Sequence, residues 1–162
     1  MILTHAIIHI PVDVRAGRIT GKDKRKVTNL KYVNFLKNEK INARDEALDN
    51  GPVTMKLYNR IIKQKGIKTI LANGPFGLIE NRSFRFGTFQ VARLFLENQQ
   101  AFRVYGGGEL NHGFNMFSKR FKIDTEQLGE QSNAVMECCN TLQTTAICPD
   151  FVLYQRKKFS HG

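Results

Sequence analysis

The chain has 162 residues, of which 25 are Lys or Arg and 14 are Asp or Glu, so its formal net charge is +11. This length predicts one domain that can bury a real hydrophobic core. A hydrophobic content of 41% argues against a wholly disordered chain. The longest apolar run, residues 2–12, contains His5, His9 and Pro11 and is shorter than the ~20 residues that a membrane span requires. We therefore expect a cytoplasmic globular protein without a membrane partner.

Neither the cysteines nor the charge identifies a function. Cys138, Cys139 and Cys148 are too few for a disulfide framework, so we expect reduced thiols. A charge of +11 is compatible with nucleotides, nucleic acids, anionic lipids or phosphorylated metabolites, and by itself it selects none of them.

The first third of the chain predicts a strand, a basic excursion and a helix. Residues 5–12 (HAIIHIPV) form an apolar, β-branched run that is typical of a buried strand. Residues 15–48 form a basic excursion whose cations gather between Arg15 and Lys40, and we expect an exposed loop with a short element near residues 30–36. A turn at residues 49–52 (DNGP) then precedes an amphipathic helix, with Pro52 at its first position and Gly66 as its C-cap.

Strands and helices then alternate. Residues 67–72 (IKTILA) and 101–105 (AFRVY) predict buried strands, and helices are expected from an N-cap at Thr88 to about residue 98 and over residues 109–117. This order predicts a Rossmann-like, three-layer α/β fold with a mostly parallel sheet. Residues 123–162 form a divergent extension, for which we expect a helix near residues 125–139 and an edge strand at residues 151–154.

Two glycine-containing loops follow predicted strands, where ligands bind in open α/β sheets. They are NGPFGLIE at residues 73–80 and GGGEL at residues 106–110. Glycines at a helix N-terminus let backbone N–H groups approach a phosphate, and Glu109 would there hold a Mg²⁺ ion that bridges phosphate oxygens. A tight turn explains the three glycines equally well, and Glu109 is also favourable simply as a carboxylate near the positive end of a helix dipole.

Several motifs in order carry a resemblance to a known family. They are IPVD at residues 10–13, DNGPVT at 49–54, ANGPFGLIE at 72–80, the FxxGT pattern of Phe84, Gly87 and Thr88, and GGG at 106–108. With these spacings, residues 6–122 resemble the C-terminal, nucleotide-binding half of phosphoglycerate kinase. Ala72 before Asn73 is more similar to archaeal members. The resemblance divides the chain into a partial nucleotide-binding domain at residues 1–122 and the extension at 123–162.

The resemblance implies a site for Mg²⁺ with ATP or ADP. The residues that it assigns to nucleotide binding are Asn73, Gly74, Gly77, Glu80, Gly106, Gly107 and Gly108. Glu80 would hydrogen-bond the ribose, and the three glycines would cradle the phosphates. Glu109 stands where the family has an Asp that takes part in Mg²⁺ binding, whereas Leu110 replaces a phosphate-contacting Thr or Ser, so one phosphate contact is lost.

Other parts of the family's machinery have no counterpart here. These are the domain that binds 3-phosphoglycerate, a GGxK segment of the adenine pocket and a closing STGGG loop. The family's glycolytic reaction transfers a phosphoryl group between 1,3-bisphosphoglycerate and ADP and needs both substrates in line. We therefore assign no catalytic residue and expect the chain to be inactive alone.

Three hypotheses remain open at this point. The chain is a fragment or split subunit of a kinase that works with a partner chain carrying the missing half. Alternatively, it is a degenerate relative recruited to bind RNA or the ribosome through Arg15–Lys40 and Arg156–Lys158, with Tyr32, Phe35 and Phe159 stacking on bases. The third hypothesis is a gene remnant in which residues 123–162 are foreign sequence.

Overall fold

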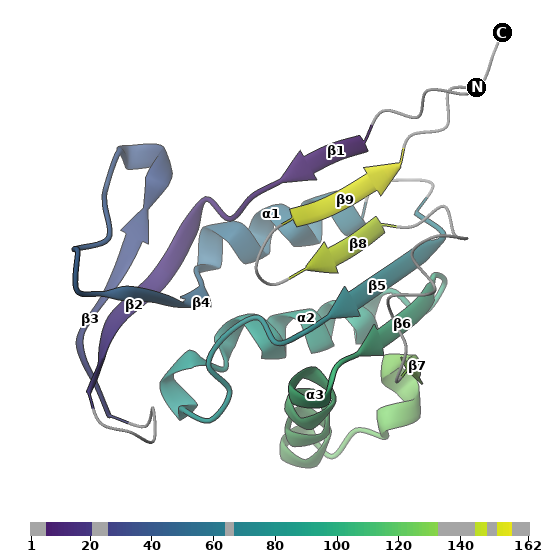
Figure 1. Ribbon diagram of the computed structural model, residues 1–162. Coiled ribbons are helices and arrows are strands. Elements are labelled where there is room, and N and C mark those ends of the chain that lie inside the picture. Colours follow the sequence, from purple (N-terminus) through teal and green to yellow (C-terminus); the bar gives the residue numbers. More distant parts are fainter. Residues whose placement is uncertain (1–5, 21–25, 64–66, 133–144, 149–151, 157–162) are drawn as a thin grey trace, which may run out of the picture.

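The computed structural model describes residues 6–20, 26–63, 67–132, 145–148 and 152–156 (Figure 1). The strands are β1 Ala6–His9, β2 Asp13–Thr20, β3 Lys26–Asn34, β4 Glu46–Asn50, β5 Thr69–Asn73, β6 Phe102–Gly106, β7 Glu130–Ser132, β8 Thr145–Cys148 and β9 Val152–Arg156. The α-helices are α1 Pro52–Ile62, α2 Phe86–Glu97 and α3 Gly108–Phe121, and short 3₁₀ turns span Phe35–Lys37, Arg82–Phe84 and Thr125–Leu128. No helix in these ranges is both long and apolar enough to cross a membrane.

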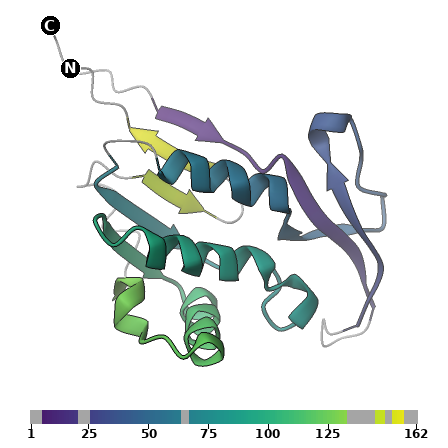
Figure 2. The same ribbon diagram turned by 180° about the vertical axis from the view of Figure 1, so that it is seen from behind.

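A six-stranded sheet forms the centre of the molecule, with the order β1-β9-β8-β5-β6-β7. Strand β5 runs parallel to β6 and β8, and β6 runs parallel to β7, whereas β9 is antiparallel to both of its neighbours. Figures 1 and 2, which view the molecule from opposite sides, place α1 and α2 on the same face of this sheet. The predicted α/β class with a mostly parallel sheet is confirmed.

The basic excursion is a second sheet rather than a loop. Strands β2, β3 and β4 pair antiparallel in the order β3-β2-β4, and Val14, Ala16 and Val33 form a small core beside them. Buried Asp45 holds the sheet together from one end, because its carboxylate accepts a 3.2 Å hydrogen bond from Arg18 and another from Asn42 at 3.0 Å. The short element expected near residues 30–36 is present as the end of β3 and the following 3₁₀ turn. The exposed loop expected around it was wrong, because pairing with β2 holds β3 and β4 in a sheet although most β3 side chains are exposed.

The predicted helices are found, with changes at their ends. Pro52 occupies the first turn of α1 as expected, while Gly66 lies outside the described residues. Thr88 is not an N-cap, because α2 already begins at Phe86. The Thr88 hydroxyl instead accepts a 3.0 Å hydrogen bond from the Phe76 amide and so ties α2 to the loop after β5.

The C-terminal extension departs most from its prediction. Residues 125–132 form a 3₁₀ turn and β7 instead of the start of a helix, and residues 133–139 lie outside the described ranges. Strand β9 is not an edge strand, since it pairs with both β1 and β8. Strands of the extension therefore lie on both sides of the β5–β6 pair, so it completes the sheet rather than merely following it.

The main core lies between the helices and the large sheet. Phe114 of α3 is fully buried, with its ring 5.4 Å from that of Phe95 and 4.6 Å from that of Tyr105. Leu110 belongs to the same core and is fully buried. This packing fixes α2 and α3 against β5 and β6, and thereby fixes the loops at the ends of those strands.

Candidate functional site

The two glycine loops meet at one edge of the large sheet. Asn73 and Gly106 are partners in the parallel pairing of β5 and β6, so the strands end side by side. One residue further on, the Gly74 amide donates a 3.2 Å hydrogen bond to the Gly106 carbonyl. Figure 1 shows both loops leaving this edge, with α3 starting directly after β6. Carboxyl ends of parallel strands are where such sheets bind ligands.

Two of the glycines at this edge are required by the backbone conformation. Gly74 has φ 79° and Gly107 has φ 92°, which lie in the left-handed region that side chains disfavour. A Cβ at Gly107 would also lie 3.3 Å from the Gly74 nitrogen and 3.4 Å from Asn73 Oδ1. The structure thus brings together Asn73, Gly74, Gly106 and Gly107, four of the residues predicted from sequence.

The N-terminus of α3 is open at this edge. No side chain caps the helix, whose N-cap is Gly107, and a Cβ added at Gly108 would meet nothing within 4 Å. Glu109 is exposed in the first turn and is its one acidic residue. Uncapped N–H groups at the positive end of a helix favour an anion. Leu110 points into the core instead, so its side chain is not available to a ligand here.

These residues fit a nucleotide phosphate with Mg²⁺. The space at Gly108 leaves room for a phosphate against the backbone. Magnesium is commonly held by one or two carboxylates together with phosphate oxygens, which matches a lone Glu109. Within the described ranges no three His, Cys, Asp or Glu side chains gather as a metal centre. Glu109 would therefore act with a bound phosphate rather than as part of a protein-only metal site.

Gly77 and Glu80 lie further along the same loop. Glu80 is exposed. Gly77 packs closely between β4 and the 3₁₀ turn at Arg82–Phe84, since a Cβ there would lie 2.3 Å from the Phe84 carbonyl oxygen and 2.4 Å from Asp49 Oδ1. Gly77 therefore has a packing reason to be glycine, whether or not it contacts a ligand.

Asp49 is a buried ionisable residue that the sequence did not single out. The residue is 4% exposed, and Oδ1 accepts 2.9 Å hydrogen bonds from the amides of Asn50 and Gly87. Burial raises the pKa of Asp49 to about 8, against the opposing effects of these backbone hydrogen bonds and of Arg15. In the sequence the residue was interpreted as part of a DNGP turn and of the DNGPVT motif, without a role of its own, and nothing local distinguishes a buried carboxylate from an exposed one.

A cavity of about 410 Å³ lies beside the Asn73–Glu80 loop, and β4 forms its opposite wall. Its apolar surface comes from Val14, Leu48, Pro75 and Leu78, and Asp49 and Gly77 also line it. A cavity of this size, with apolar and polar groups in its walls, can take a small organic ligand. The sequence missed it because β4 was assigned to the excursion.

Comparison with known proteins identifies the family of this chain. The family model for phosphoglycerate kinase matches residues 3–125, a range that includes both loops, α1, α2 and α3. The chain belongs to the phosphoglycerate kinase family.

Individual relatives agree with this assignment. Phosphoglycerate kinase from Buchnera aphidicola subsp. Schizaphis graminum is 38% identical over 116 residues, which are 72% of this chain and 27% of the relative. The enzyme from Methanococcus maripaludis is 40% identical over 76 residues, which are 47% of this chain and 18% of the relative. The archaeal character predicted from Ala72 stays a prediction, because these two matches do not decide it.

A solved structure shows the same fold. The structure of phosphoglycerate kinase from Coxiella burnetii superposes with a TM-score of 0.63 and 25% sequence identity, over 82% of this chain and 31% of that one. This chain therefore spans between about a fifth and a third of the relatives that it matches.

Proposed function

We propose that this chain binds Mg²⁺ with ADP or ATP at the shared edge of β5 and β6, as the nucleotide-binding part of a phosphoglycerate kinase. The observation that carries the proposal is the contact between the two loops, in which the Gly74 amide donates to the Gly106 carbonyl beside the open N-terminus of α3. It supports a phosphate site at the ends of β5 and β6, next to the loop whose residues 75–78 line the cavity beside β4.

Each part of a nucleotide has a matching surface. The phosphates would lie on Gly106, Gly107 and Gly108. These residues have no side chains to cover the backbone, and the positive end of the α3 dipole lies there. The base would enter the cavity beside Leu48 and Leu78. The exposed Glu80 carboxylate would accept hydrogen bonds from the ribose.

Bound Mg²⁺ would neutralise negative charge on the transferred phosphoryl group. The Glu109 carboxylate would hold the ion against the phosphates, and backbone N–H groups of α3 would orient them.

Catalysis by the chain alone does not follow from this site. Transfer to or from 1,3-bisphosphoglycerate requires a second anionic substrate held in line with the nucleotide. We assign no group of the described residues to that substrate. We propose that the family reaction takes place only with further protein that supplies the second site.

Isothermal titration with Mg²⁺·ADP tests nucleotide binding directly. We expect saturable heat from the full chain, and about tenfold weaker binding, or about 1.4 kcal/mol, for Glu80→Ala. Gly108→Val should weaken binding at least as much, because its side chain would fill the open space at the phosphates. Glu126→Ala, an exposed acidic residue away from the loops, is the matched control and should bind normally.

Glu109→Gln separates the metal from the nucleotide. The variant should reduce the gain in ADP affinity that Mg²⁺ gives over ADP in EDTA. The affinity for ADP in EDTA, without metal, should be unchanged. Absence of heat from the folded wild-type chain, or equal affinities for wild type, Glu80→Ala and Gly108→Val, would contradict the proposal.

A further inference from the structure

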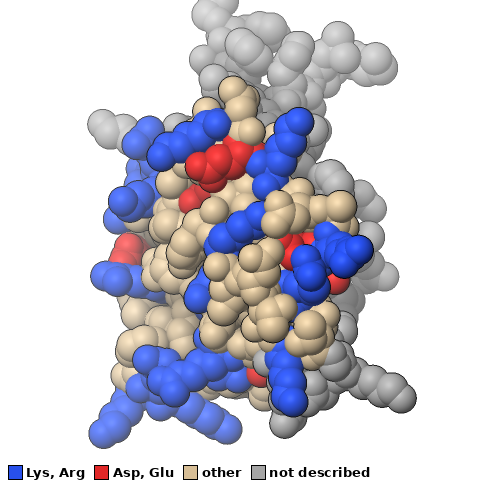
Figure 3. Space-filling view, turned by 90° about the vertical axis from the view of Figure 1, so that its left-hand side faces the viewer, with Lys and Arg blue, Asp and Glu red and all other residues tan. Residues whose placement is uncertain are grey.

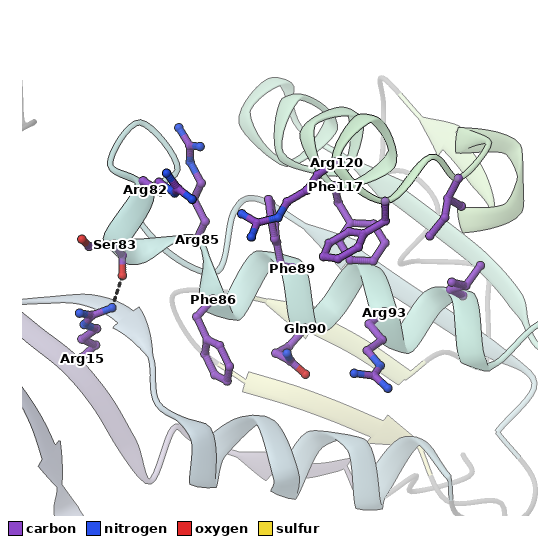
Figure 4. Close-up of a pocket in the computed structure, with 13 residues that line it drawn as sticks. Arg15, Arg82, Ser83, Arg85, Phe86, Phe89, Gln90, Arg93, Phe117 and Arg120 are labelled. Carbon is purple, nitrogen blue, oxygen red and sulfur yellow. Dashed lines mark hydrogen bonds between the residues drawn. The ribbon is translucent and has the colours of Figure 1, made fainter.

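A groove of about 590 Å³ runs along the side of α2, between this helix and the C-terminal half of α3 (Figure 4). Its walls contain five arginines from four separate elements and loops: Arg15, Arg82, Arg85, Arg93 and Arg120. Its floor is aromatic, with Phe86, Phe89, Phe117 and Phe121. No Asp, Glu or Lys lines it, and none of its residues belongs to the loops at the β5–β6 edge.

Three of the five arginines contact rings or carbonyl groups rather than carboxylates: Arg15, Arg85 and Arg120. The Arg120 guanidinium lies 5.7 Å from the ring centre of Phe121, and Arg85 Nε donates to the Ile79 carbonyl at 2.6 Å. Arg15 donates to the Ser83 carbonyl, as Figure 4 shows. Of the five groove arginines, Arg93 alone has an acidic partner, Glu97, among the ion pairs of the described residues. The groove therefore keeps most of its positive charge for an anion.

The rings of the floor form a rigid platform that is partly open to solvent. Phe89 meets Phe117 edge-on at 5.6 Å, and Phe117 lies 4.7 Å from Phe121. Although Phe121 is packed in this way, 51% of it is exposed. A contiguous exposed apolar patch with polar residues at its rim commonly marks a binding surface.

The basic and aromatic character continues from the groove onto the small sheet. Arg15 lies 5.6 Å from the ring centre of Tyr32, a residue of β3 that is 54% exposed. Figure 3 looks onto this end of the molecule and shows many Lys and Arg side chains with few acidic ones among them. The basic surface therefore extends beyond the groove, and Tyr32 adds an exposed ring to it.

We propose that this groove binds single-stranded nucleic acid. Phosphates would pair with the arginines, whose planar guanidinium groups bind phosphate oxygens in pairs, and unstacked bases would lie on Phe121 and Tyr32. The 12 residues of α2 span roughly 18 Å, enough for about three nucleotides. A nucleic acid fits better than an acidic peptide because it carries one flat ring for every charge.

This site differs from the RNA surface expected from sequence. That surface was placed on Arg15–Lys40 and Arg156–Lys158, and Arg15 is its one residue in the groove. The expected surface also contains Tyr32, the exposed ring beside Arg15 on the small sheet. The other arginines come from the segment before α2 and from α2 and α3, which are far apart in sequence. Residues 157 and 158 lie outside the described ranges.

Fluorescence anisotropy with labelled 12-nucleotide RNA and DNA single strands, measured on the full chain over a range of salt concentrations, tests the proposal. The double variant Arg82→Gln/Arg120→Gln should bind about 25-fold more weakly at 0.1 M salt. Its slope of log affinity against log salt should be shallower by about 1.4. Each phosphate contact on a single strand releases about 0.7 counterions, and the double variant loses two such contacts. The control Arg44→Gln/Arg60→Gln removes the same charge from exposed positions outside the groove, and it should bind within about twofold of wild type.

A second variant tests the aromatic platform independently of charge. Phe121→Leu keeps an apolar side chain but removes the ring, and we expect about tenfold weaker binding with an unchanged salt slope. Circular dichroism shows whether each variant remains folded. Should Phe121→Leu itself unfold, Tyr32→Leu on the small sheet provides the same comparison.

Three results would overturn the proposal. The first is wild-type binding that is absent at 0.1 M salt, and the second is equal weakening by the groove and control double variants. The third is tighter binding of polyglutamate than of either single strand, which would identify an acidic peptide instead. The nucleotide-binding proposal can fail separately from this one. Glu80→Ala should leave the anisotropy of the labelled strands unchanged, and Arg82→Gln/Arg120→Gln should leave the Mg²⁺·ADP heat unchanged.

Discussion

The amide of Gly87 donates a 2.9 Å hydrogen bond to Asp49 Oδ1, across 38 residues of sequence. A Cβ at Gly87 would lie 2.5 Å from the same oxygen, and one at Gly77 would lie 2.4 Å from it. Two glycines of the phosphoglycerate kinase motifs therefore leave room for a buried carboxylate. Through it, β4, the loop after β5 and the start of α2 are held in one arrangement beside the candidate nucleotide edge.

The buried carboxylate makes stability depend on pH. Because burial raises the pKa of Asp49 from 3.8 to about 8, the folded chain retains a proton that the unfolded chain releases between these values. The free energy of unfolding should therefore fall as pH rises from about 4 to 8, by up to ~1.4 kcal/mol per pH unit from this group. Urea denaturation at pH 5, 6, 7 and 8 measures the slope.

Asp49→Asn is the control for this slope, because its side chain has nearly the same shape and does not titrate. The difference in unfolding free energy between wild type and variant should change steadily in favour of the variant as pH rises. A difference that stays constant from pH 5 to 8 would show that Asp49 has an ordinary pKa.

Alanine at two glycines should have opposite effects on stability. Gly87→Ala should lower the free energy of unfolding by about 2–4 kcal/mol, because its methyl group would also lie 2.7 Å from the Phe76 carbonyl oxygen. Gly108→Ala places its methyl group in open space within a helix and should raise stability by about 0.5–1 kcal/mol. Thermal denaturation of both variants makes the comparison, and similar Tm shifts would refute it.

Asp13 and Thr54 form a buried hydrogen-bond network at the N-terminus of α1. Asp13 Oδ1 accepts hydrogen bonds from the Thr54 amide at 2.6 Å and the Thr54 hydroxyl at 2.7 Å, and Oδ2 accepts one from the Val53 amide at 3.0 Å. The Thr54 hydroxyl oxygen in turn accepts from the amides of Val12 and Asp13. The network explains why the PVD and GPVT motifs occur together.

Thr54→Val should cost about 2–3 kcal/mol, because it leaves these two amides without their acceptor while preserving side-chain shape. Thr20→Val is the control, since the Thr20 hydroxyl bonds the Lys26 carbonyl at an exposed position, and it should cost less than about 0.5 kcal/mol. Chemical denaturation measures both. Adding Asp13→Ala to Thr54→Val should cost less than the sum of the single changes, and strict additivity would show that the two residues act separately.

Elements with strong local patterns could be predicted, and elements that depend on pairing could not. The continuous apolar run at residues 67–72 predicts the buried strand β5. The helical spacing of apolar residues after Pro52 predicts α1, because only one side of that helix is buried. Strand β3 has a mostly exposed pattern, and its partner β2 supplies the reason that it is a strand. The helix expected from residue 125 fails in the same way, since β7 pairs with distant β6.

By itself, the sequence determined the α/β class, the order of the central strands and helices, and the family. Hydrophobic periodicity and glycine motifs are local patterns, which can be recognised from residues close together in the sequence. Only the tertiary structure decided which distant residues meet. It placed Gly74 against Gly106, enclosed Asp49 between two glycines and gathered arginines from separate elements around one aromatic groove. Burial and electrostatic surroundings depend on three-dimensional packing, so no local pattern could reveal them. The charge of +11 was visible at once, whereas its concentration beside exposed rings was not.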